Sequence, residues 1–252
     1  MKGLLLYGLL VRCLAVLLSF AGILFGYFIE PVAWQERSLA PMAHHVISGE
    51  RYDTKMLADA LNHANLIISD SCITTGLRSV AFIRLRLVED AIGEADRRSL
   101  DDRLDAFKAA ALRSLSCAPA DPFLWFALYW VEVTQRGFAP ELLVYLQKSY
   151  QLGPFEGWIQ VKRNRFALAV YDKLPEDLAR QVVLEFKTLV NSGFTADAAS
   201  ILVGPGWNIR SKLLAPLDDV KMRYRRELFK EVRRAGYEVA IPGVDTEVRP
   251  WN

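Results

Sequence analysis

The stretch that decides the fold spans residues 121–158 and reads DPFLWFALYWVEVTQRGFAPELLVYLQKSYQLGPFEGW. Asp121 followed by Pro122 predicts the start of a helix, because aspartate accepts hydrogen bonds from the free N–H groups at a helix N-terminus and proline fits the first helical position. That helix is expected to end at Gly137, and a second helix is expected to end at Gly153. The stretch therefore predicts two helices joined by a short turn.

The same arrangement occurs twice in the chain. Residues 112–125 (LRSLSCAPADPFLW) and residues 146–158 (LQKSYQLGPFEGW) each end a helix, pass through a proline turn and open the next helix with a tryptophan. Trp125 and Trp158 lie about one tetratricopeptide period, ~34 residues, apart. Paired helices of this kind bury their apolar faces by stacking on their neighbours. The prediction is an all-α chain with a tetratricopeptide-like (TPR-like), right-handed helical repeat domain over residues 53–235, with an irregular helical bundle as the alternative.

Helix patterns continue on both sides of this stretch, whereas the C-terminal residues 236–252 are expected to form an extended tail. The further helices are predicted over residues 53–66, 77–95, 101–115, 155–171, 175–192, 195–203 and 218–235.

The N-terminal residues 3–29 read GLLLYGLLVRCLAVLLSFAGILFGYFI, with Arg12 as their only charge. A helix needs ~20 apolar residues to cross the hydrocarbon core of a bilayer. Arg12 lies inside the span if the span begins near the N-terminus, and at its boundary if the span begins at Cys13. Residues 1–29 are therefore predicted to form a single transmembrane anchor.

The charges that flank this segment predict its orientation. Lys2 and Arg12 lie on the N-terminal side, and Glu30 and Glu36 follow the segment. The positive-inside rule then places the N-terminus in the cytoplasm and the helical domain in the periplasm of a bacterial inner membrane. A cleaved signal peptide, with a small-x-small site at residues 19–21, is the alternative.

Residues 30–52 contain two prolines, a glycine and many polar residues, which predicts a linker. His44 and His45 in this segment are interpreted as solvated side chains rather than as metal ligands.

Three cysteines are present, and none is spaced as a zinc ligand. Cys72 and Cys117 could form one disulfide in an oxidising compartment, or could be two buried thiols.

No catalytic motif is found in the sequence, and the charge is nearly balanced, with 31 Lys and Arg against 29 Asp and Glu. The adjacent carboxylates Asp101-Asp102 and Asp218-Asp219 point about 100° apart on a helix, and we interpret them as groups that favour a helix start. The chain is therefore expected to be no enzyme, to hold no cofactor or metal, and to bind no nucleic acid.

The predicted last helix carries the strongest local charge, in the sequence LDDVKMRYRRELFKEVRRAG at residues 217–236. Its polar side is either the solvated outer face of a capping helix or a surface that binds anionic lipid, an acidic partner or an anionic polysaccharide. The candidate interaction residues of the chain are Trp130, Arg163, Arg165, Arg225, Arg226, Arg233 and Arg234.

The middle third of the chain carries a further pattern. It consists of A-P-x-x-P-x-x-W (Ala118, Pro119, Pro122, Trp125), S-Y-x-L-G-P-x-E-x-W (Ser149, Tyr150, Leu152, Gly153, Pro154, Glu156, Trp158) and then Arg163 and Arg165. This pattern resembles VpsP-like proteins, small accessory proteins of bacterial exopolysaccharide biosynthesis. The resemblance implies an envelope-anchored helper whose partners are the lipid bilayer and other polysaccharide-assembly proteins, and it supplies no catalytic residues.

Two alternative functions remain. A periplasmic enzyme acting on a glycan would need carboxylates such as Glu156 and Glu185 about 5–9 Å apart in a groove. A scaffold of a secretion or pilus system would look the same in sequence, and genomic neighbours would separate it from the first hypothesis.

Overall fold

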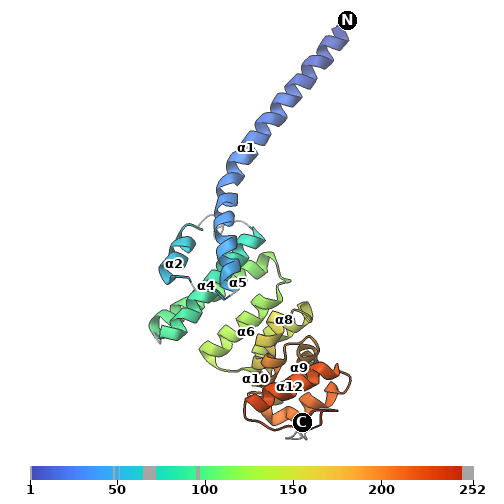
Figure 1. The fold of residues 1–252 in the computed structure, drawn as a ribbon. Helices are drawn as coiled ribbons and strands as arrows, with labels where there is room; N and C mark the ends of the chain where they lie inside the picture. Colours follow the sequence, from blue (N-terminus) through green and yellow to red (C-terminus); the bar gives the residue numbers. More distant parts are fainter. Residues whose placement is uncertain (1, 48, 51, 65–71, 95–96, 246–252) are drawn as a thin grey trace. The chain divides into compact units, whose positions relative to one another are not determined.

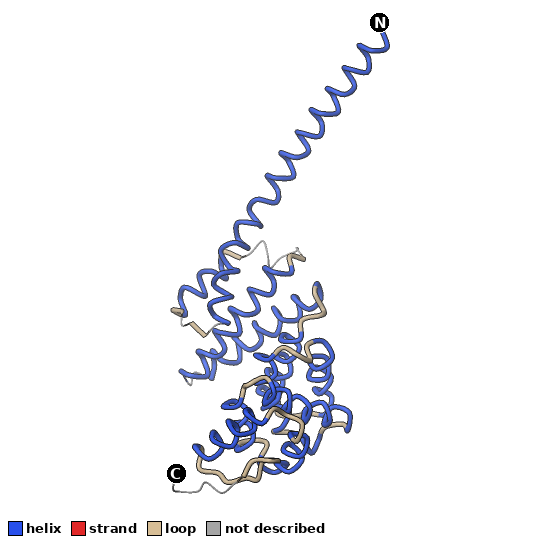
Figure 2. Tube along the Cα trace, turned by 45° about the vertical axis from the view of Figure 1, so that its right-hand side comes forward, coloured by secondary structure: helices blue, strands red, loops and turns tan. Residues whose placement is uncertain are grey.

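The computed structural model describes residues 2–47, 49–50, 52–64, 72–94 and 97–245. Within these ranges every regular element is a helix (Figures 1 and 2), which confirms the predicted all-α class. The chain divides into two compact units, Met1–Pro119 (unit 1) and Ala120–Asn252 (unit 2), where the sequence predicted one helical domain over residues 53–235.

Unit 1 is built around α4, Thr74–Glu94, which packs against each of the other helices that the structure describes in the unit. These are α1 (Lys2–Ile47), α2 (Thr54–Asn62) and α5 (Arg97–Cys117). Val80 and Ile83 of α4 and Phe107 of α5 are buried between these helices. The unit is therefore a small helical core with α4 at its centre.

The helix α1 continues through the segment predicted as a linker. Residues 30–47 are helical although Pro31 and Pro41 lie among them, so the predicted linker is wrong there. Leu39 and Ala43 lie one turn apart, are buried, and belong to the part of α1 that packs on α4. This burial offsets the backbone hydrogen bonds that the prolines cannot donate.

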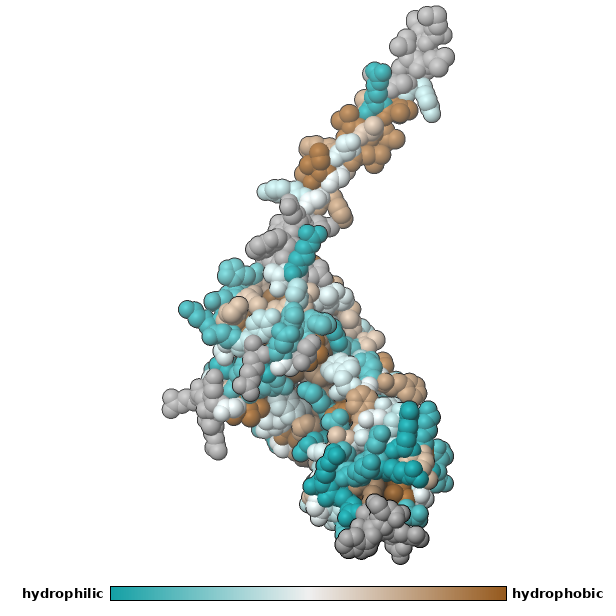
Figure 3. Space-filling model, viewed as in Figure 1, coloured by the Kyte–Doolittle hydropathy of each residue, from teal (hydrophilic) through white to brown (hydrophobic). Residues whose placement is uncertain are grey.

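The first part of α1 projects beyond the other helices of unit 1 (Figure 1). Its apolar side chains between Val11 and Tyr27 are exposed and form a brown band in Figure 3. Within the described ranges, no helix combines the length and the apolar character that a membrane crossing needs.

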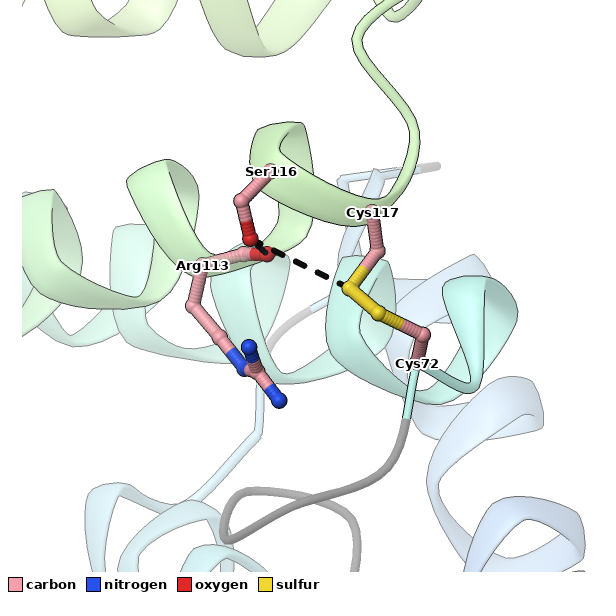
Figure 4. The surroundings of a disulfide bond; sticks show 4 residues. All are labelled: Cys72, Arg113, Ser116 and Cys117. Atoms are coloured by element: carbon pink, nitrogen blue, oxygen red, sulfur yellow. Dashed lines mark hydrogen bonds between the residues drawn. A yellow bond between two sulfur atoms is a disulfide. The ribbon is translucent and has the colours of Figure 1, made fainter.

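A disulfide joins Cys72, just before α4, to Cys117, the last residue of α5 (Figure 4). The alternative of two buried thiols is therefore wrong. Cys13 is a free, exposed thiol. The disulfide ties the start of α4 to the end of α5, the helix pair with the most extensive packing among the described helices, and closes the chain across 45 positions of sequence.

Unit 2 contains two successive helix pairs followed by a compact C-terminal group of helices. In the first pair α6 packs against α7, in the second α8 packs against α9, and α10 then packs against α12. The α-helices are α6 (Pro122–Arg136), α7 (Leu143–Leu152), α8 (Gly157–Leu168), α9 (Glu176–Asn191), α10 (Thr195–Val203), α11 (Arg210–Leu214) and α12 (Met222–Arg234). The short 3-10 helices are η1 (Pro140–Leu142), η2 (Tyr171–Lys173), η3 (Trp207–Ile209) and η4 (Ala215–Leu217).

The start of α6 forms as predicted. Asp121 accepts hydrogen bonds from Phe123 N at 3.0 Å and Leu124 N at 3.2 Å, and Pro122 takes the first helical position. The helix ends at Gly137, whose φ of 78° suits glycine because it has no Cβ. The local signals in residues 121–137 therefore set the boundaries of α6.

The two tryptophans of the predicted repeat contact different partners. Trp125 stacks on Tyr145 of α7 with 6.0 Å between ring centroids. Trp158 lies 4.8 Å from the ring of Phe123 on α6 and is 39% exposed. The helix pairs thus follow each other in sequence, but the tryptophans do not occupy equivalent packing positions.

The paired carboxylates lie elsewhere than at helix starts. Asp101 and Asp102 fall inside α5, which begins at Arg97, so their interpretation as helix-start groups is wrong. Asp219 lies in the turn before α12, where its carboxylate accepts a hydrogen bond from Lys187 Nζ at 2.6 Å. Asp219 thereby links the turn before α12 to Lys187 on α9.

Candidate functional site

The predicted interaction residue Arg163 is fully buried, with 0% of its surface exposed. Its Nε donates to Glu185 Oε1 at 3.0 Å, and its Nη2 makes an ion pair with the same oxygen. The remaining donors bind carbonyls at the C-terminal end of α7, with Nη1 2.6 Å from Ser149 O and Nη2 3.0 Å from Gly153 O. Because these protein groups occupy the guanidinium, the interpretation of Arg163 as a surface residue is wrong.

Glu185 on α9 accepts further hydrogen bonds in the same cluster. Tyr150 Oη donates to its Oε2 at 2.5 Å, and Asn164 Nδ2 lies 3.2 Å from the same oxygen. Burial raises the pKa of Glu185, and the charge of Arg163 opposes this shift. Burial and the charge of Glu185 raise the pKa of Tyr150 well above its usual value.

Glu156 and Glu185, the example of a carboxylate pair for a glycan-acting enzyme, lie in different surroundings. Glu185 is buried among protein donors, whereas Glu156 is exposed at the start of α8. The two carboxylates therefore do not face a common groove, and the cluster joins α7, α8 and α9 as part of the unit 2 core.

Unit 1 contains a pocket of about 210 Å³ beside two arginines that bind across helices. Arg84 Nη1 of α4 donates to Ala106 O of α5 at 2.8 Å, and Arg103 Nη1 of α5 donates to Leu87 O of α4 at 2.9 Å. Burial lowers the pKa of Arg84. These reciprocal bonds hold α4 against α5, so we interpret the two arginines as structural.

A larger groove, of about 600 Å³, runs along α12 and forms the best candidate site. One wall is α12 and the other is the tail that follows it. The residues that line this α12 groove are Arg226, Phe229, Lys230, Arg233, Arg234, Gly243, Val244 and Asp245.

The tail wall is held in place by packing and by one hydrogen bond. Ile241 is buried, and Pro242 O accepts a hydrogen bond from Arg225 Nη1 at 2.6 Å. Gly243 has a φ of 70°, and a Cβ at this position would lie 2.8 Å from Arg225 Nη1. Arg225 is therefore half-buried and holds the tail through its hydrogen bond to Pro242 O, so it does not act as a free surface cation.

The electrostatic character of the α12 groove is positive. Arg226, Lys230 and Arg234 follow each other at four-residue intervals, which puts them on one side of the helix with a rise of ~6 Å between neighbours. Glu231 forms an ion pair with Arg234 at 2.5 Å, and Asp245 is the carboxylate of the opposite wall. The cations of the groove therefore outnumber its carboxylates.

The apolar face of α12 is not part of the exposed surface. Leu228 and Val232 are buried in unit 2, and Phe229 is 9% exposed at the base of the groove. The guanidinium of Arg233 lies 5.7 Å from the Phe229 ring centroid and covers it.

The candidate interaction residues predicted from the sequence do not form one site. Arg226, Arg233 and Arg234 lie together in the α12 groove. Trp130, half-buried on α6, and Arg165, exposed on α8, do not line that groove.

Sequence reasoning missed the tail wall, because no local pattern shows that residues 237–245 fold back on α12. The signals that could have indicated it are the apolar Ile241 and the turn at Pro242-Gly243. The described part of the tail forms no strand and follows the surface of α12 as a loop.

In the described ranges, no three His, Cys, Asp or Glu side chains gather as metal ligands. His45 Nδ1 lies 2.7 Å from Glu50 Oε1 near the end of α1.

No family model, curated protein or solved structure matches this chain.

Proposed function

We propose that this chain is a membrane-anchored, non-catalytic accessory protein of bacterial exopolysaccharide biosynthesis or export, which binds partner proteins through its helical units. The observation that carries the proposal is the two-part character of α1. Its apolar side chains between Val11 and Tyr27 are exposed, whereas Leu39 and Ala43 are buried in unit 1. Contiguous exposed apolar surface favours an apolar environment such as the interior of a bilayer. The described apolar side chains alone do not reach the length of a crossing, but the sequence continues the apolar stretch before Val11 and after Tyr27 to the ~20 residues that a crossing needs.

In this proposal residues 1–29 form a single inner-membrane anchor with a cytoplasmic N-terminus, and both units lie in the periplasm. The disulfide between Cys72 and Cys117 supports that side of the membrane. Disulfides persist in oxidising compartments such as the periplasm and are kept reduced in the cytosol. The flanking charges at Lys2 and Arg12 favour the same orientation.

The scaffold role rests on the two successive helix pairs of unit 2. Helices α6 to α9 follow the order expected for TPR-like repeats, whose neighbouring pairs create extended binding surfaces. The assignment to exopolysaccharide rests on the resemblance of residues 118–165 to VpsP-like proteins.

Membrane fractionation of cells that express the full chain tests the anchor. We expect the wild-type chain in the carbonate-resistant membrane fraction and the Leu17→Arg/Leu18→Arg variant largely outside it, since each central arginine costs about 2.5–3.5 kcal/mol on insertion. Val144→Arg, a change at an exposed apolar residue of α7, is the matched control and should remain in the membrane. A wild-type chain found in the soluble fraction would overturn the proposed anchor.

Photo-crosslinking tests the scaffold role. A photoreactive amino acid placed at Arg165 or Trp130 should capture membrane or periplasmic proteins of polysaccharide assembly, identified by mass spectrometry. Capture of secretion or pilus components instead would favour the alternative scaffold function. No captured partner at either position would contradict both scaffold proposals.

A further inference from the structure

We propose that the α12 groove binds an extended acidic polysaccharide that carries both carboxylates and hydroxyl groups. This inference rests on the proposed function and adds to it the chemical class of the polymer. The groove is the cleft of about 600 Å³ between α12 and the tail.

The arrangement of charges favours an extended polyanion over a compact one. Arg226, Lys230 and Arg234 form a row along the helix axis with a rise of ~6 Å between neighbours, and Arg233 lies beside this row. Arg234, at the end of the row, also pairs with Glu231, so Arg226, Lys230 and Arg233 are the main cations of the row. A row of this kind can bind successive negative groups of a polymer. A single phosphate or carboxylate would contact only one end of the row.

The opposite wall favours a polymer with hydroxyl groups. Asp245 contributes a carboxylate that can accept hydrogen bonds from hydroxyls but repels groups that are only anionic. Arginine binds carboxylates through paired N–H groups, which suits the uronic-acid groups of an acidic sugar chain. The groove thus presents donors on one wall and an acceptor on the other.

The residues of α12 argue against a lipid membrane as the ligand of the groove. A helix that docks on a membrane inserts an exposed apolar face between the headgroups. The apolar residues Leu228 and Val232 of α12 are instead buried in the core of unit 2. The helix therefore offers cations without the apolar face that such docking uses.

Among the described residues that line the groove, no exposed aromatic ring offers the stacking surface that single-stranded nucleic acid uses. Proteins that bind single strands stack bases on exposed aromatic rings. Phe229 is the aromatic residue among those lining the groove, and it is 9% exposed beneath Arg233.

The test measures binding of the full-length protein, purified in detergent micelles, to three probes: polygalacturonate, neutral dextran and vesicles containing phosphatidylglycerol. We expect the protein to bind polygalacturonate, to ignore dextran, and to lose affinity when NaCl rises from about 50 to about 200 mM, because charged contacts are screened. No binding to polygalacturonate, or stronger binding to the vesicles, would overturn the proposal.

Two triple variants with the same change in net charge locate the site. Arg226→Gln/Lys230→Gln/Arg233→Gln should weaken polygalacturonate binding by at least about tenfold, because charge-assisted hydrogen bonds are lost. Lys148→Gln/Lys162→Gln/Lys212→Gln removes exposed cations of unit 2 outside the groove and should change the affinity less than about twofold. Equal losses in the two variants, or no loss in the first, would contradict the groove as the binding site.

Circular dichroism and thermal melting of both variants establish that the comparison is between folded proteins. This binding test is separate from the tests of the proposed function. A protein that fractionates with the membrane and captures assembly partners, yet does not bind polygalacturonate, would refute the groove proposal alone.

Discussion

Arg163 shows how one buried side chain can determine the stability of several helices. Its guanidinium binds Glu185 of α9 and the last carbonyls of α7 while lying on α8. A buried ion pair contributes little when compared with apolar residues, but the loss of one partner leaves the other charge buried and unpaired.

We expect Arg163→Met to lower the free energy of unfolding by about 3–5 kcal/mol, measured by urea denaturation followed by circular dichroism. Arg165→Met, two residues along the same helix and exposed, is the control and should change stability by no more than about 0.5 kcal/mol. The double variant Arg163→Met/Glu185→Met should recover part of the loss. Similar stabilities of the two single variants would contradict the role of Arg163.

Tyr150 makes the stability of unit 2 depend on pH in the alkaline range. Its folded pKa is raised well above its usual value of about 10, first by burial and then by the charge of Glu185. At a pH between the usual pKa and the folded pKa of Tyr150, the unfolded chain has lost the phenol proton and the folded chain keeps it. The stabilisation is therefore complete below pH ~10 and is lost as pH rises towards the folded pKa.

In a series of urea unfolding curves above pH ~10, Tyr150→Phe should show a shallower fall of stability than the wild type. It should also be about 1–3 kcal/mol less stable at neutral pH, because Glu185 loses a donor. A residual slope is expected from Tyr129, whose pKa burial raises to about 12. Tyr237→Phe, a change at an exposed position, should match the wild type.

At the scale of single elements, α6 depends on the side chain that precedes it. Asp121→Ala removes the acceptor of two backbone N–H groups and should destabilise the protein by about 0.5–2 kcal/mol. Asp121→Asn keeps an oxygen in the same place and should lose much less. Thermal melts of the two variants, compared with the wild type, check this difference.

The elements that could be predicted are those with signals inside their own sequence. The boundaries of α6 follow from Asp121, Pro122 and Gly137, which act through local hydrogen bonds and backbone angles. The same holds for α9, predicted over residues 175–192, whose apolar residues at helical spacing are all buried: Leu178, Val182, Phe186, Leu189 and Val190.

The remaining features depend on contacts between distant residues, which local patterns do not contain. The helical course of residues 30–47 follows from packing of Leu39 and Ala43 on α4. The burial of Arg163 depends on Glu185, 22 positions away. The α12 groove was predicted only in its helical wall, because the return of the tail depends on the hydrogen bond from Arg225 to Pro242 O.

At the scale of the whole molecule, the disulfide distinguishes the two units, because both of its cysteines belong to unit 1. Cys72→Ala/Cys117→Ala should destabilise that unit by about 2–4 kcal/mol, since the unfolded chain gains conformational freedom. Hydrogen exchange should detect faster exchange in α4 and α5. Cys13→Ala, at the exposed free cysteine, should leave exchange unchanged.

The buried cluster around Arg163 limits where helix pairs can be added to unit 2 or deleted from it. Arrays of independent repeats can gain or lose a pair, because each repeat contacts only its neighbours through similar surfaces. Here the deletion of α8 would leave Glu185 without its cation and the end of α7 without a donor. Natural or designed variants with more or fewer helix pairs should therefore retain the segment from α7 to α9, and any added or deleted pair should lie outside that segment.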